Sequence, residues 1–115
     1  MIDNYYYRLD ENKNVIPCKS LEEWARFMED VDNRRVALDT MDKFQISTVF
    51  LGASHIIGDG TRNIFETLVF YKDANTEWEV VEEFPMWRYD TWDEAVEGHK
   101  KAIELVKTAT AGKRD

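Results

Sequence analysis

The sequence predicts an α+β protein with a mostly antiparallel sheet of four to six strands and two amphipathic helices packed on one face of it. Three observations support this class. Short segments rich in β-branched and aromatic residues are separated by turn signals. Two stretches have apolar residues at helical spacing, and the strand connections are short enough to favour antiparallel pairing. The 115 residues contain no internal repeat, so we expect a single compact domain over residues 1–110 and a frayed polar tail at 111–115.

The N-terminal segment predicts a β-hairpin. An aromatic, strand-like run at residues 5–10 is followed by a polar turn at 11–14 and by two apolar residues, Val15 and Ile16. Pro17 closes the second strand, because proline has no amide hydrogen to donate to the ladder.

Each predicted helix begins at a capping box, in which a hydroxyl residue and a glutamate three positions later satisfy free backbone amides. Ser20 and Glu23 form the first box, with Glu23 reaching back to the Ser20 amide, and Thr91 and Glu94 form the second. Helical spacing then places one set of residues on the apolar face of each helix. The first set is Leu21, Trp24, Met28 and Val31, and the second is Trp92, Ala95, Val96, His99, Ala102, Ile103 and Val106.

Two strands, at residues 35–40 and 44–51, are predicted on either side of a short turn. The second of them is dense in β-branched and aromatic residues, which suits a buried strand near the centre of a sheet. A glycine-bearing loop at 52–63 separates it from another strong strand at 64–71. Weaker strand signals follow at 77–81 and 86–89.

The net charge of −8 comes from one segment. Residues 73–97 contain nine acids and one base, Arg88, so the rest of the chain is neutral overall. An acidic protein is a poor ligand for nucleic acid or an anionic membrane, and no apolar run approaches the ~20 residues of a membrane helix. The one cysteine, Cys18, cannot form an internal disulfide. We therefore expect a cytoplasmic protein without a membrane or nucleic-acid partner.

A possible polar cluster consists of His55, Glu66 and His99. Glu66 lies on an otherwise apolar strand face, where a lone carboxylate is costly to bury, so we expect it to accept a hydrogen bond from His99. With His55, in a glycine-bearing loop, the set could form a metal site, a nucleotide site or an acid–base pair. The spacing is generic, however. A structural network that locks helix to sheet, with Arg8 or Thr48 as further partners, is therefore the favoured interpretation, and no cofactor or metal is predicted.

The acidic segment also contains aromatic residues, a composition typical of an interface that receives a basic partner. The alternative is that these aromatics cap the open end of a small core. A homo-oligomer formed through an exposed strand edge is a further possibility. The residues expected to bind a partner are Glu77, Trp78, Glu79, Glu82, Glu83 and Trp87.

Several strings occur in the order YYRLD, RRVA, STVFLG followed by His55, IFET with VF, and RYDTWDEAVEGH. This pattern, over residues 6–99, resembles a group of small uncharacterised proteins common in tailed bacteriophages and prophages. The sequence departs from that group in the loop after His55 and in a longer, more acidic stretch at 73–87. The resemblance implies a phage-type accessory protein and supplies no established activity. Together with the acidic segment, it leads us to expect a protein that binds a host or phage protein with a basic surface, inhibition being one mechanism.

Overall fold

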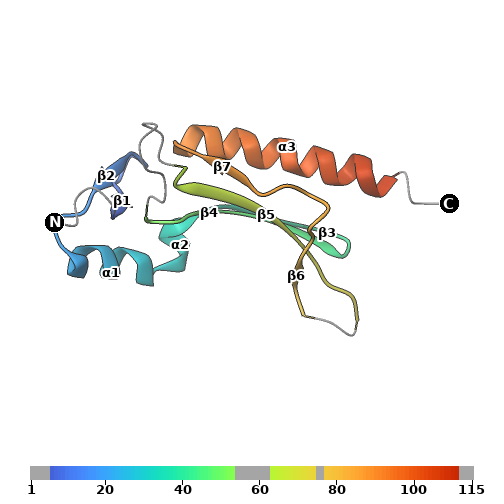
Figure 1. The fold of residues 1–115 in the computed structure, drawn as a ribbon, viewed down its shortest axis with the longest axis horizontal. Helices are drawn as coiled ribbons and strands as arrows, with labels where there is room; N and C mark the ends of the chain where they lie inside the picture. The colour runs from blue at the N-terminus through green and yellow to red at the C-terminus, as the bar shows by residue number, and fades with distance from the viewer. Residues whose placement is uncertain (1–5, 54–62, 75–76, 112–115) are drawn as a thin grey trace.

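The structure is a computed structural model, and it describes residues 6–53, 63–74 and 77–111. The protein has the α+β fold that the sequence predicts, with helices packed against antiparallel sheets (Figure 1). In chain order they are β1 (Tyr7–Leu9), β2 (Val15–Pro17), α1 (Leu21–Glu29), α2 (Val31–Arg34), β3 (Arg35–Met41), β4 (Phe44–Phe50), β5 (Phe65–Tyr71), β6 (Glu79–Val80), β7 (Trp87–Tyr89) and α3 (Trp92–Ala111).

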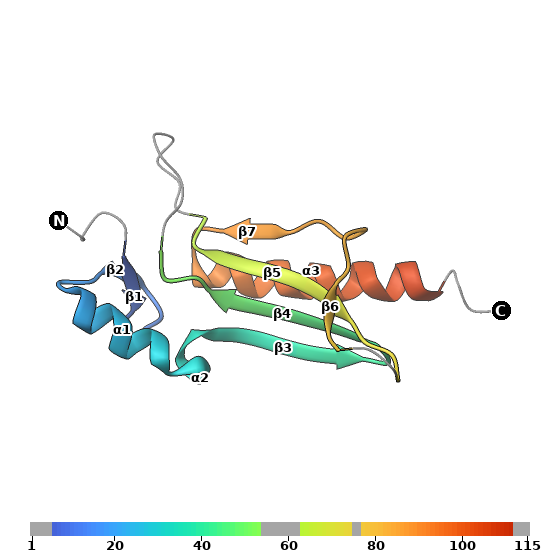
Figure 2. The same cartoon turned by 60° about the horizontal axis from the view of Figure 1, so that its bottom comes forward.

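The main sheet is antiparallel and has five strands (Figure 2). β3, β4 and β5 pair in sequence order, which places β4 inside the sheet, as the density of β-branched and aromatic residues predicts. β6 and β7 share the other edge of β5, β7 beside Phe65, Glu66 and Thr67 and β6 beside Phe70 and Tyr71. β1 and β2 form the predicted hairpin as a separate sheet of two strands.

Helix α3 lies along one face of the main sheet (Figure 1). Its buried residues are Ala95, His99, Ala102 and Val106, all members of the predicted apolar face. The other helix, α1, packs against β1 at the end of the sheet and so differs from the expectation that both helices lie along one face. The reason is that its apolar residues meet the end of β4: the indole of Trp24 donates a 2.8 Å hydrogen bond to the carbonyl of Gly52.

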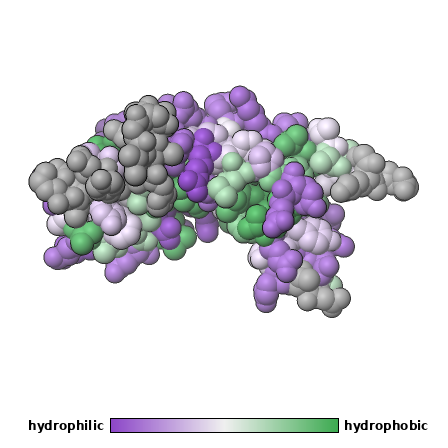
Figure 3. Space-filling view, viewed as in Figure 1, coloured by the Kyte–Doolittle hydropathy of each residue, from purple (hydrophilic) through white to green (hydrophobic). Residues whose placement is uncertain are grey.

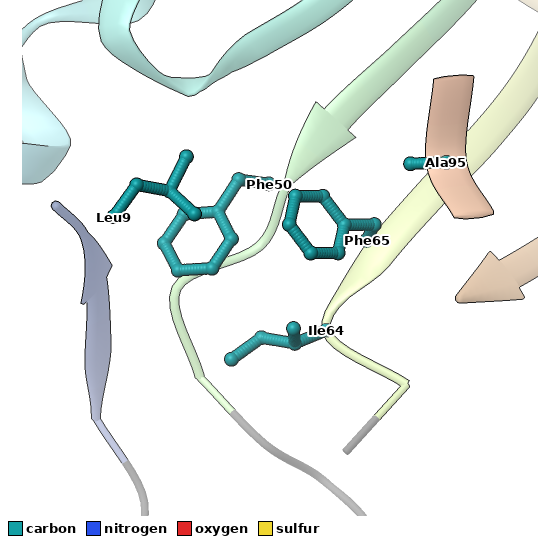
Figure 4. Close-up of a cluster of buried hydrophobic side chains, with 5 residues drawn as sticks. All are labelled: Leu9, Phe50, Ile64, Phe65 and Ala95. Carbon is teal, nitrogen blue, oxygen red and sulfur yellow. The ribbon is translucent and has the colours of Figure 1, made fainter. Parts of the chain in front are cut away.

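The hydrophobic core between α3 and the sheet consists of two clusters. The first contains Leu9, Phe50, Ile64, Phe65 and Ala95, so it joins the hairpin, the sheet and α3 (Figure 4). The second lies further along α3 and contains Ile46, Val69, Ala102 and Val106. Burying a side chain of this size contributes roughly 1.5–3 kcal/mol, so these clusters fix the position of α3 on the sheet.

Both capping boxes are present. The amide of Glu23 donates to Ser20 Oγ at 3.1 Å, while the Glu23 carboxylate accepts from the Lys19 amide at 2.8 Å, one residue before the amide that was predicted. At α3, the amide of Glu94 donates to Thr91 Oγ1 at 3.1 Å and its carboxylate accepts from the Thr91 amide at 3.2 Å. These local contacts set where the two longer helices begin.

Candidate functional site

A chain of hydrogen-bonded polar side chains, buried except for Asp39, which is 52% exposed, crosses the interface between the sheet and α3. His99 Nδ1 lies 2.7 Å from Thr48 Oγ1, which lies 2.5 Å from Thr67 Oγ1. On the other side of the ring, His99 Nε2 lies 2.7 Å from Asp39 Oδ2. Asp39, Thr48 and Thr67 belong to β3, β4 and β5. One histidine therefore ties the helix to three neighbouring strands.

The direction of the hydrogen bonds follows from the acceptor character of a carboxylate. In the neutral imidazole, Nε2 carries the proton and donates it to Asp39. Nδ1 then accepts from the Thr48 hydroxyl, and Thr48 Oγ1 in turn accepts from the Thr67 hydroxyl. The buried polar atoms of His99, Thr48 and Thr67 thus each have a partner, which is what a buried polar group requires.

The residue types of this chain are those of a nucleophile, a base and an orienting acid, but their placement is unsuited to catalysis. Thr48 and Thr67 have no exposed surface, and His99 is 3% exposed. A catalytic hydroxyl must meet its substrate, and the Thr48 hydroxyl is enclosed by sheet and helix. Of the residues considered from the sequence for a network between helix and sheet, His99 and Thr48 take part in this one.

The expected hydrogen bond from His99 to Glu66 is wrong. Glu66 pairs with Arg88 on β7, with Oε2 3.1 Å from Nε and 3.0 Å from a terminal guanidinium nitrogen. The alternation of β5 explains this: Phe65, Thr67 and Val69 are buried, whereas the alternate residues, Glu66 among them, are only partly so. Of the two alternative further partners, Thr48 contacts His99, whereas Arg8 lies 3.6 Å from Glu23.

The remaining chemical candidates gain no support as a site. His55 lies outside the described residues, and the residues that are described contain no group of three or more His, Cys, Asp or Glu side chains able to hold a metal ion. Cys18 is 1% exposed. Burial raises the pKa of its thiol, and the nearby Glu23 carboxylate raises it further against the opposing effect of Arg8. A buried thiol of raised pKa is a poor nucleophile.

The predicted partner-binding residues lie on one continuous stretch, residues 77–87, which we call the acidic strip. It comprises β6 and the connection to β7. Its inward residues, Val81, Phe84 and Trp87, are half-buried against the second core cluster. Its outward residues are exposed: Trp78 by 37%, Val80 by 50% and Met86 by 57%. Phe84 and Trp87 therefore cap the core, as the alternative interpretation expects, whereas Trp78 faces solvent, as an interface residue would.

The acids of the strip are exposed, and Glu77, Glu79, Glu82 and Glu83 make no ion pair within the part of the chain that the structure describes. Three acidic residues outside the strip do have partners within the protein: Glu23 and Glu94 cap helices, and Glu66 pairs with Arg88. An acidic surface free of internal partners is available to an external cation.

A groove of about 660 Å³ runs beside the strip, between β7 and α3. Trp87 and Tyr89 line it from β7, and Glu97, Lys101 and Leu105 line it from α3. The ring of Tyr89 lies so close to Gly98 that a Cβ there would overlap it. Burial raises the pKa of the Tyr89 phenol, which is protonated at neutral pH in any case. Sequence reasoning missed this groove because it depends on the approach of a short strand to a helix.

Comparison with protein-family models, with curated proteins and with solved structures finds no match for this chain. Within the described ranges, no helix is long and apolar enough to cross a membrane.

Proposed function

We propose that this protein is a small accessory module that binds a partner protein through the acidic strip. The observation that carries the proposal is the coincidence of four exposed glutamates, which form no ion pair with any described residue, with exposed apolar side chains at Trp78, Val80 and Met86. Large apolar groups supply contact area, and surrounding charge selects an oppositely charged partner and speeds its approach. The partner therefore presents a basic surface with apolar positions within it.

The resemblance to tailed-phage and prophage proteins supports a host or phage protein as that partner, met in the bacterial cytoplasm. The buried network supports a binding role in another way. Because His99 and its partners hold α3 on the sheet, the strip and the groove beside it are presented on a fixed scaffold. Occupation of the partner's basic surface would block whatever else that surface binds, which is how such a module inhibits.

The test is capture of partners by a variant in which Glu77, Glu79, Glu82 and Glu83 are all changed to glutamine. Each charge contributes about 0.5–1 kcal/mol at a partly screened interface, so we expect binding to weaken roughly 30- to 1000-fold. Thermal stability should stay within about 0.5 kcal/mol of wild type, because these side chains are exposed and unpaired.

The matched control removes the same number of exposed acids elsewhere, as Glu11→Gln, Glu22→Gln, Glu29→Gln and Glu104→Gln. Both proteins then have the same net charge, so a purely global charge effect would weaken both equally. Quantitative mass spectrometry of proteins captured from a bacterial lysate compares wild type and both variants. Loss of one set of partners from the strip variant alone supports the proposal, and equal capture by all three contradicts it. Size-exclusion chromatography of the same samples tests self-association.

A further inference from the structure

The free edge of β7 borders the groove between β7 and α3. β7 pairs with β5 along one side through Phe65, Glu66 and Thr67, and no described strand pairs with its other side (Figure 2). The unpaired side of a strand presents backbone donors and acceptors that accept a further strand. Here the edge opens onto a cavity of about 660 Å³ whose opposite wall is α3. A ligand strand between a sheet edge and a helix would gain both backbone hydrogen bonds and side-chain contacts.

Gly98 makes this arrangement possible. Because Gly98 has no side chain, the ring of Tyr89 rests directly on α3 and forms the floor of the groove. Trp87 lies two residues before Tyr89 on the same face of β7 and continues the floor toward Leu105. Alternate side chains of an added strand would lie beside Trp87 and Tyr89 on the face that α3 covers, and the others would project from the opposite face of the sheet.

The two ends of the groove differ in chemistry. Glu94 and Glu97 line the groove near the start of α3, and Leu105, which is 43% exposed, lines it about two turns further along the helix. Two cations line the groove: Arg88 is neutralised by Glu66, whereas Lys101 forms no ion pair with any residue that the structure describes. On the face seen in Figure 3, apolar surface gathers between α3 and the β6–β7 connection, with hydrophilic surface on either side. The groove thus carries net negative charge at one end and apolar surface at the other.

We propose that this groove binds an extended, basic peptide segment of the partner protein, which adds as a strand to the free edge of β7. The inference rests on the proposed function and extends it, since Trp87 belongs both to the acidic strip and to the groove. The segment places a lysine or arginine near Glu97 and a large apolar side chain between Trp87 and Leu105. Charge complementarity selects the basic end, and the shape of the groove selects an extended backbone.

The test is selection from a library of random twelve-residue peptides, followed by titration of the enriched peptides against the whole protein. We expect enriched sequences to carry a basic residue and a large apolar residue. Glu97→Lys should weaken the binding of these peptides about tenfold, because the new positive charge repels the basic residue of the peptide that Glu97 attracts. Glu104→Lys is the control. Glu104 lies two turns further along α3, and both glutamates pair with a lysine three residues later, at 3.3 Å for Glu97 and 3.5 Å for Glu104.

Backbone readouts separate strand addition from other binding. The amide hydrogens of Trp87, Arg88 or Tyr89 that face the groove should become protected from exchange, and N-methylation of alternate ligand amides should remove binding. No enriched basic peptide, equal binding by Glu97→Lys and Glu104→Lys, or binding that survives N-methylation at every position overturns the proposal. Loss of partner capture in the strip variant, with no effect of Glu97→Lys, would refute strand addition and leave the acidic strip as the binding surface.

Discussion

Replacement of Thr48 by valine tests whether the buried chain holds α3 to the sheet. Valine has nearly the shape of threonine, so the change removes the hydroxyl and little else. Thr48 Oγ1 bridges Thr67 Oγ1 at 2.5 Å and His99 Nδ1 at 2.7 Å, and both neighbours then lose a partner in a region without solvent. The perturbation is therefore the creation of two unpaired buried polar groups.

The expected cost follows from that count. An unsatisfied buried polar group costs about 1–3 kcal/mol, so two of them destabilise the protein by about 2–6 kcal/mol. For a domain of this size the midpoint of thermal unfolding should fall by roughly 10–30 °C. Changing Thr67 to valine as well removes one of the two orphaned groups. The Thr48→Val, Thr67→Val double variant should thus be more stable than Thr48→Val alone, by about 1 kcal/mol.

Urea unfolding followed by tryptophan fluorescence measures these free energies. Thr40→Val is the control, because Thr40 is exposed on the neighbouring strand β3 and its replacement should change stability by less than about 0.5 kcal/mol. Two results would mean that the hydrogen-bonded side chains do not have the structural role assigned to them. In the first, Thr48→Val lowers the free energy of unfolding no more than the control does; in the second, the double variant loses the sum of what Thr48→Val and Thr67→Val each lose.

Three further outcomes follow from individual contacts. Cys18 should react with a thiol reagent at least about a hundredfold more slowly in the native than in the urea-unfolded protein, since its buried thiol needs local opening; a rapid native reaction would contradict this. Hydrogen bonding to the Lys19 amide lowers the pKa of Glu23 below its ordinary value of 4.5. The ionised carboxylate therefore stabilises the folded protein fully above about pH 4.5, and this stabilisation is lost as the pH falls through the lower pKa of the folded state. The stability difference between wild type and Glu23→Gln should therefore shrink from about pH 6 to about pH 3 in urea titrations, and a constant difference would exclude the carboxylate. Arg88→Met should cost about 1–3 kcal/mol by urea unfolding, more than Glu66→Met, because it strands a carboxylate whose side chain is 12% exposed; equal costs would argue against a coupled pair.

Local signals in the sequence predicted the elements of this fold well. The capping boxes at Ser20 and Thr91 depend on contacts three residues apart, and the start of each helix follows from them. The hairpin turns and the burial of β4 likewise follow from neighbouring residues. The placement of α1 depends on what the rest of the chain leaves uncovered, and no local pattern specifies it.

The polar cluster shows where sequence reasoning fails. Both faces of β5 are largely apolar, so alternation alone could not tell whether Glu66 or Thr67 faces the helix. The choice is made by β7, which brings Arg88 opposite Glu66. Asp39 is 60 residues from His99 in the chain and gave no sign of the contact. The available signals for the network were His99 on the apolar face of its helix and Thr48 among buried strand positions.

We propose that the buried network maintains the fold and that the acidic strip binds a partner, and one paired measurement tests both proposals. Thermal unfolding and partner capture are measured on the same preparations of Thr48→Val and of the variant with Glu77, Glu79, Glu82 and Glu83 changed to glutamine. We expect Thr48→Val to melt lower yet capture its partners at a temperature where it is still folded, and the glutamine variant to melt as wild type does yet capture none. Full capture by the glutamine variant, or loss of capture by folded Thr48→Val, would contradict the account.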